Sequence, residues 1–152
     1  MANRLFKMRQ FRSDANVIGE DPGADPSQKL SSIAFGTGSS VAFDKSDQCF
    51  IADKVNHVIY RMKQGQSANV VAGSYGVSGD AIGEGSVARF NAPTAICVDN
   101  KGVIYIVDSG NDTIKRMDEN GKVTGFAPLT TGTIAGGISV DSKGDVYIVD
   151  AI

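Results

Sequence analysis

The stretch Pro93-Thr-Ala-Ile-Cys-Val-Asp-Asn-Lys-Gly-Val-Ile-Tyr-Ile-Val-Asp-Ser-Gly-Asn-Asp-Thr-Ile-Lys-Arg-Met117 decides the fold. It contains three short apolar runs, at 94–98, 104–107 and 113–117, which are rich in β-branched residues and too short for helices. Asp-Asn-Lys-Gly and Asp-Ser-Gly-Asn separate these runs. Both are typical of hairpin turns, because glycine and asparagine adopt positive φ at low cost. The stretch therefore predicts an antiparallel β-meander.

The same pattern recurs before and after this stretch. The first run with its closing aspartate is found as Val41–Asp44, Ile96–Asp99 and Ile138–Asp141; the second as Phe50–Asp53, Tyr105–Asp108 and Tyr147–Asp150; and the third as Ile59–Met62 and Ile114–Met117. The units recur at a spacing of roughly 40 to 50 residues, which together with about four strands per unit indicates a β-propeller. The fold class predicted is thus all-β, with four-stranded antiparallel blades.

One unit also has a family resemblance. The residues Val98-Asp99, Gly102, Tyr105-Ile-Val-Asp108-Ser-Gly-Asn111, Ile114 and Arg116 resemble the NHL repeat, and the segment 83–93 is similar to its usual run-in. This resemblance implies a blade of a six-bladed propeller. It also implies a binding platform in most cases, and a lyase or hydrolase in a minority.

The repeats divide the chain into six predicted segments. Residues 39–73 and 92–126 are predicted to be complete blades, and 20–38 and 74–91 are the connections before them. Residues 1–19 are expected to supply the third and fourth strands of a further blade, because 5–8 and 15–19 match the corresponding strands of the first complete unit. Residues 127–152 are expected to hold the first half of that split blade.

This division predicts a homodimer. The chain has strands for about three blades, whereas a closed propeller needs at least four, and an open arc would leave apolar blade faces in water. Two copies would make a six-bladed ring, in which the C-terminal half-blade of each copy is completed by the N-terminal strands of the other. The residues assigned to this assembly seam are Leu5, Phe6, Met8, Val17, Ile18, Val146, Tyr147 and Ile148. A fragment of a longer propeller, or a different protein that supplies the missing blades, is the alternative.

Composition narrows the class of partner. The chain has 15 basic and 17 acidic residues, scattered along it, with a net charge of −2. A nucleic-acid surface normally shows clustered lysine and arginine, so nucleic acid is not the expected partner. No apolar run approaches the roughly 20 residues that span a bilayer, and no secretory signal is visible. A cytoplasmic or virion location is expected, and Cys49 and Cys97 are predicted to be buried thiols.

The repeated polar positions are predicted to be structural. Asp53, Asp108 and Asp150 end the second strand of each unit, and Asn56 and Asn111 follow three residues after the first two of them. A residue that occurs once per blade suits a role in each blade, so we expect these carboxylates to accept N–H groups of the following turn.

Candidate chemistry is sparse elsewhere. His57 is the only histidine and is predicted to be an exposed turn residue, which leaves no zinc set and no Ser-His-Asp constellation. No cofactor is expected, although a calcium ion at the central channel stays open, since it needs only oxygen ligands. The glycine-rich segment 73–85 lacks the helix that a phosphate loop requires. The candidate partner-binding rim is Tyr75, Asp80 and Arg89.

The predicted function follows from these observations. A noncatalytic NHL-type propeller that acts as a self-assembling scaffold or partner-binding module is favoured, because repeated residues stand where catalytic ones would be unique. A lyase or hydrolase that uses a calcium ion at the channel is the alternative. A structural component of a virion or another large assembly is a further one.

Overall fold

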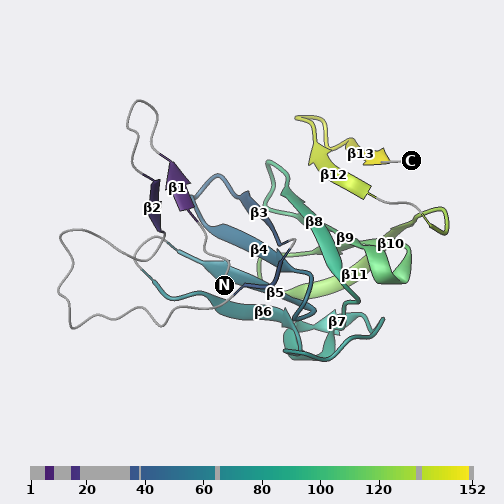
Figure 1. Ribbon diagram of the computed structural model, residues 1–152. Helices are drawn as coiled ribbons and strands as arrows, with labels where there is room; N and C mark the ends of the chain where they lie inside the picture. The colour runs from purple at the N-terminus through teal and green to yellow at the C-terminus, as the bar shows by residue number, and fades with distance from the viewer. Residues whose placement is uncertain are drawn as a thin grey trace.

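The computed structural model is all-β, and its strands form separate antiparallel sheets (Figure 1). The structure describes residues 6–8, 15–17, 35–37, 39–63, 66–132 and 135–150. The all-β, antiparallel class predicted from the repeat is confirmed. Of the seam residues, Leu5 and Ile18 lie outside the described part, as does most of the predicted connection 20–38; for 6–8, 15–17 and Asp150 the backbone alone is described.

Each predicted unit contains one sheet. The first sheet has the order β3 (Ser40–Phe43), β4 (Cys49–Asp53), β5 (Val58–Met62), β6 (Asn69–Gly73). The second has the order β7 (Gly83–Glu84), β11 (Lys122–Pro128), β10 (Thr113–Met117), β9 (Ile104–Asp108), β8 (Pro93–Val98). The third pairs β12 (Ala135–Val140) with β13 (Val146–Asp150), and an N-terminal ribbon pairs β1 (Phe6–Met8) with β2 (Ala15–Val17). Two short 3-10 helices complete the description, η1 (Gly85–Val87) and η2 (Ser109–Asn111).

The three sheets are stacked side by side. The first strand of the second sheet, β8, is flanked by β3 on one side and by β12 on the other, an arrangement that can be followed in Figure 1. All five residues of β9 are buried, because the second sheet has a neighbour on each face. This explains why its sequence, Ile-Tyr-Ile-Val-Asp, is a continuous apolar run that ends in one acid and does not alternate.

The two sheet–sheet interfaces use equivalent positions. Between the first and second sheets, Phe50 and Ala52 of β4 pack in one cluster with Ile96, Ile104 and Ile106. Between the second and third sheets, the equivalent face of β8 and β9 packs against β12 and β13. The residues of the second sheet are Ala95, Cys97, Tyr105 and Val107, and those of the third sheet are Ile138, Val140, Val146 and Ile148. One face of each sheet therefore meets the opposite face of the next.

The three aromatic residues that begin the second strands differ in exposure. Phe50 is 2% exposed and Tyr105 is 8% exposed, as expected for side chains between stacked sheets. Tyr147, in the same position of the third unit, is 58% exposed. The reason is that no sheet of the described chain covers this face of β13.

The second sheet has one strand more than the four predicted. Residues of the preceding connection form β7, which pairs with β11 so that Glu84 lies opposite Lys122 and Gly83 opposite Val123. The amide of Gly85 also donates to the carbonyl oxygen of Gly121 at 2.9 Å. The connection 74–91 is therefore hydrogen-bonded to the outer edge of the blade that follows it.

The N-terminal ribbon repeats the geometry of the first sheet. In β1–β2, Phe6 lies opposite Val17 and Lys7 opposite Asn16. In β5–β6 the matching residues are paired in the same way, with Tyr60 opposite Val70 and Arg61 opposite Asn69. The ribbon thus has the register of a third and fourth blade strand.

Candidate functional site

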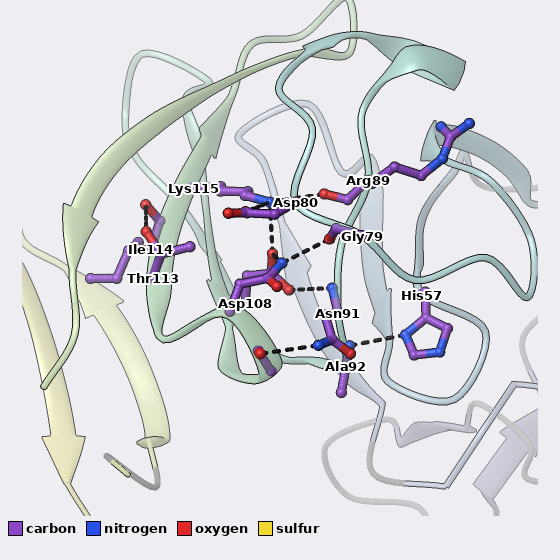
Figure 2. A network of polar contacts seen from close by, with 12 residues as sticks. His57, Gly79, Asp80, Arg89, Asn91, Ala92, Asp108, Thr113, Ile114 and Lys115 are labelled. Carbon is purple, nitrogen blue, oxygen red and sulfur yellow. Dashed lines mark hydrogen bonds and ion pairs between the residues drawn. The ribbon is translucent and has the colours of Figure 1, made fainter. Parts of the chain in front are cut away.

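The most polar buried site of the described chain is centred on Lys115, in the middle of β10 (Figure 2). Its side chain is 2% exposed, and Nζ lies 2.8 Å from Asp108 Oδ2 and 2.8 Å from Asp80 Oδ1. Nζ also donates to the carbonyl oxygen of Arg89 at 2.8 Å, and it lies 5.4 Å from the centre of the Phe90 ring. An ammonium group has three N–H donors, so these three oxygens saturate it.

Asp108 connects this lysine to the backbone. It is the last residue of β9 and is fully buried. Its Oδ1 accepts the amide of Asn91 at 2.7 Å, and its Oδ2 accepts the side-chain amide of Asn111 at 2.7 Å. Burial raises the pKa of Asp108, and the bonds from Lys115, Asn91 and Asn111 oppose that rise.

The corresponding acid of the first unit has a different set of donors. Asp53, also fully buried, accepts the turn amides of Val55 and Asn56 at 3.1 and 3.0 Å on Oδ1. Its Oδ2 accepts Gly36 N at 3.1 Å and the side-chain amide of Asn56 at 2.8 Å. Tyr60 stands where the second unit has lysine, and burial, followed by the charges of Asp53 and Tyr75, raises the pKa of Tyr60 to about 12.

These contacts show what the repeated acid does. In both units the carboxylate binds an asparagine three residues later and an amide from the connection before the blade, so it fastens that connection to the second strand. Bonding to the backbone amides of the following turn, the expected pattern, is observed for Asp53, whereas Asp108 accepts only the side-chain amide of Asn111 from its turn. In the second unit the turn is the 3-10 helix η2, whose Gly110 amide donates to the carbonyl oxygen of Asn91. Lys115 supplies one donor to Asp108 in place of those turn amides.

Four further aspartates cap turns, and three of them, Asp44, Asp99 and Asp141, occupy matching positions of the repeat. Each ends a strand and caps the turn that follows by accepting two of its amides, as Asp99 does from Lys101 and Val103 at 2.8 Å each. The signal was visible as Asp-x-x-Gly in three of the four turns, because the fourth turn residue needs positive φ. The four caps are Asp44, Asp99, Asp118 and Asp141.

The candidate rim residues have separate roles. Tyr75 is 62% exposed, whereas Asp80 is bound to Lys115 although its side chain is 66% exposed. Arg89 is half-buried, and its guanidinium donates to the carbonyl oxygens of residues 86–88. The connection also exposes apolar side chains that no sequence pattern had indicated, namely Val77, Ile82 and Val87.

His57 differs from the expected exposed turn residue. It occupies a left-handed position, φ 58°, in the turn between β4 and β5, and it is half-buried. Its Nδ1 accepts the backbone amide of Ala92 at 3.0 Å, just before β8 (Figure 2). The imidazole therefore links the first sheet to the start of the second, which the sequence did not indicate.

The two thiols are free and buried. Burial raises the pKa of Cys49 to about 11, and burial followed by the charge of Asp99 raises that of Cys97 to about 11. Within the described residues, no group of three or more histidine, cysteine or acidic side chains is placed to hold a metal ion. In the same part of the chain, no helix has the length and apolar character needed to cross a membrane.

Stacked antiparallel sheets whose first strands lie side by side define a propeller-type all-β architecture. Residues 90–117, which cover β8 to β10, match the family model of the NHL repeat. The resemblance to NHL repeats is thereby confirmed. No curated protein matches the sequence.

Solved structures share the fold. A protein of unknown function from Bacteroides thetaiotaomicron has a TM-score of 0.76 at 17% identity, over 97% of this chain and 40% of that one. Auxiliary nutrient binding proteins from Bacteroides thetaiotaomicron and Bacteroides ovatus have TM-scores of 0.61 and 0.62 at 21% and 19% identity, over 72% of this chain and 34% of theirs. The chain thus spans about a third to two fifths of the length of these structures.

Proposed function

We propose that this chain is a noncatalytic NHL-type propeller module that acts as a self-assembling scaffold or as a platform for a binding partner. The observation that carries the proposal is the saturation of its buried ionic site. All three donors of Lys115 are taken by oxygens of the fold, and Asp108 is fully buried. A catalytic lysine or carboxylate needs an atom that can reach a substrate, and neither group offers one.

The strands nearest the expected channel support the same proposal. The first strands of the three described sheets, β3, β8 and β12, contain no acidic residue and no histidine. The acids that end these strands cap the turns with their Oδ1 atoms. Calcium prefers six to eight oxygen ligands with several carboxylates. This distribution of acids supports a noncatalytic module over the alternative lyase or hydrolase with calcium at the channel.

A binding role would place the partner on the connection 74–91. This segment is fastened to the blade by Asp80 and the carbonyl oxygen of Arg89, which both bind Lys115, and by β7. It nevertheless exposes Tyr75 and Ile82 at 62% and 56%. Exposed side chains on a rigidly held loop are suited to recognition. Two of the structurally similar proteins are described as auxiliary nutrient binding proteins, so binding has a precedent on this fold.

The proposal includes ring closure by two copies of the chain. Two copies would provide six blades, the number that the resemblance to NHL propellers implies. A ring of this kind serves equally a free scaffold and a component of a larger assembly, such as a virion.

Metal analysis combined with thermal unfolding tests the noncatalytic proposal. The purified protein, as isolated and after treatment with a chelator, is measured for bound divalent ions and for its Tm with and without added calcium. We expect no stoichiometric ion and a Tm that neither treatment changes. One tightly held divalent ion per chain or per ring, whose removal lowers the Tm by several degrees, would overturn the proposal.

A further inference from the structure

Two apolar surfaces of the described chain lack a covering sheet, and together they correspond to the two sides of an interface that the molecule already contains twice. One is the outer face of the third sheet, where Tyr147 and Val149 are 58% and 67% exposed. The other is the outer face of β3 in the first sheet, where Val41 and Phe43 are 42% and 53% exposed. We call them the leading face and the trailing face.

The residues of the leading face are equivalent to those with which the first sheet packs on the second and the second sheet packs on the third. In the second sheet the matching positions are Tyr105 and Val107, which are 8% and 0% exposed under the third sheet. Val107 packs there in a cluster with Ile138. By the repeat, the residue that corresponds to Ile138 in the first sheet is Val41, on the trailing face. The leading face is therefore shaped to receive a trailing face.

The trailing face is uncovered only along its first strand. Ile96, which matches Val41 in the second sheet, is 4% exposed. On β4, the next strand of the first sheet, Cys49 and Ile51 are 1% and 2% exposed. The uncovered region is thus one inner strand wide. The third sheet, with only two strands described, is an inner half-blade of the kind that would cover it.

The edges of the strands match as well. In the second unit β9 pairs with β10 along its whole length, with Tyr105 opposite Arg116. Its counterpart β13 has no neighbour on that edge among the described strands. The N-terminal ribbon has the register of a third and fourth blade strand, and Figure 1 draws it on the side of β3 away from β8. Among the described strands, the third sheet contains only a first and a second blade strand, and the N-terminal ribbon has the register of a third and a fourth.

We propose that a second copy of this chain joins the two halves. The inference rests on the proposed assembly function and specifies its surface. β13 of one copy pairs with β1 of the other, with Lys7 opposite Tyr147 and Met8 opposite Val146, as Arg116 and Met117 lie opposite Tyr105 and Ile104. The leading face of the first copy then packs on the trailing face of the second. A second copy is the occupant because the contact continues an interface already repeated within the chain.

The contact joins the leading face of one copy to the trailing face of the other. Each copy has both faces, so a twofold dimer contains the contact twice. Each copy gives its leading face to one seam and its trailing face to the other, and no unlike surface stays open once the ring has closed. The arrangement has a diagnostic consequence. A dimer of two different variants can have one altered seam and one unaltered seam.

Charge complementation tests that consequence. Val149→Asp and Val41→Lys each place an unpaired charge in both seams of their own dimer, so each should weaken dimerisation about 100-fold or more. When the two variants are mixed, one seam contains the Asp–Lys pair and the other is wild type, and the dimer should return with one copy of each. Ile82→Asp, an equally drastic change on the connection 74–91, is the matched control and should dimerise like the wild type.

Sedimentation equilibrium at micromolar concentration gives the result, and circular dichroism checks that each variant is folded. A wild-type chain that is a folded monomer overturns the inference. Variants that dimerise as the wild type does, or a mixture that stays monomeric, overturn it as well.

A cross-link tests the register even if a charged variant does not fold. Antiparallel Cα partners lie about 4.5 to 5.5 Å apart, within disulfide range. Lys7→Cys with Tyr147→Cys should give a covalent dimer under oxidation, whereas Lys7→Cys with Val149→Cys, two residues out of register, should not. The native thiols are buried and have pKa values of about 11, so they react slowly. Equal cross-linking of both pairs, or of neither, overturns the proposed pairing.

The two proposals fail separately. A bound catalytic metal in a dimer that passes the complementation test would overturn the noncatalytic function and leave the interface standing. A metal-free monomer would overturn the interface and leave the noncatalytic function standing.

Discussion

Replacing Lys115 with methionine removes the ammonium that pairs with Asp108 while keeping much of the side chain's volume. Asp108 would retain two hydrogen-bond donors, Asn91 N and the side chain of Asn111, whereas its counterpart Asp53 has four. Removing one partner of a buried ion pair costs about 3 to 5 kcal/mol. We expect the free energy of unfolding at neutral pH to fall by that amount.

The matched control is Asp80→Asn, which removes the other carboxylate from the same lysine. The Asp80 side chain is 66% exposed, so its ion pair is screened by solvent and should contribute less than about 1 kcal/mol. Asp108→Asn in the methionine background should recover part of the loss, because a neutral amide needs no cation. Urea unfolding of the four proteins, followed by circular dichroism, gives these differences.

The pH dependence identifies Asp108 as the group responsible. Its pKa is raised in the folded protein, so folding favours its protonated form, and that stabilisation is present below the unfolded carboxyl pKa, about 3.9. It is lost as pH rises through the folded pKa. Without Lys115 the folded pKa should rise further, and the deficit of the methionine variant should shrink on acidification from neutral pH. A deficit that is the same at pH 7 and at about pH 4, or one below about 1 kcal/mol at neutral pH, would refute this reasoning.

Three other predictions concern packing and assembly. Gly121 has a φ of 90°, and a Cβ there would lie 2.6 Å from a backbone oxygen of β6. Gly121→Ala should therefore destabilise the fold by clearly more than the roughly 1 to 2 kcal/mol that a left-handed alanine costs. Gly132→Ala, with a φ of 86° and open space around the residue, is the control in thermal unfolding. Tyr105→Ala should cost about 3 to 5 kcal/mol in denaturant, whereas Tyr147→Ala should weaken dimerisation and leave unfolding of the separated chain unchanged. Deleting residues 1–19 should abolish the dimer in sedimentation; a truncated dimer would contradict the role given to the ribbon.

The repeat made the strands predictable. Short apolar runs ended by Asp and Gly fix each hairpin locally, and the second strand is a continuous apolar run because sheets cover both of its faces. Asn120-Gly121, a dipeptide typical of hairpin turns, lies in the turn between β10 and β11 for the same local reason. These features depend on residues close in sequence, which a pattern can show.

The polar network was predicted only in part because its partners are far apart in the chain. Asp108 was expected to bind its own turn, yet it contacts Asn91, 17 residues earlier. His57 binds the amide of Ala92, 35 residues away. Lys115 stands in a repeat position occupied by tyrosine in the first unit, so nothing in the pattern marked it. Long-range pairs of this kind follow from how the sheets stack, which is decided after the strands.

The bond between Lys115 and Asp80 changes where a unit of this protein begins. Counted by strands, the second blade starts at Pro93, but its buried lysine depends on an acid in the segment before it. A graft cut at residue 93 would carry the lysine without Asp80 and Asp108 without the amide of Asn91. Recombination or engineering of such repeats should therefore cut before Gly79, whose carbonyl oxygen accepts Asn111, so that each blade travels with the connection that precedes it.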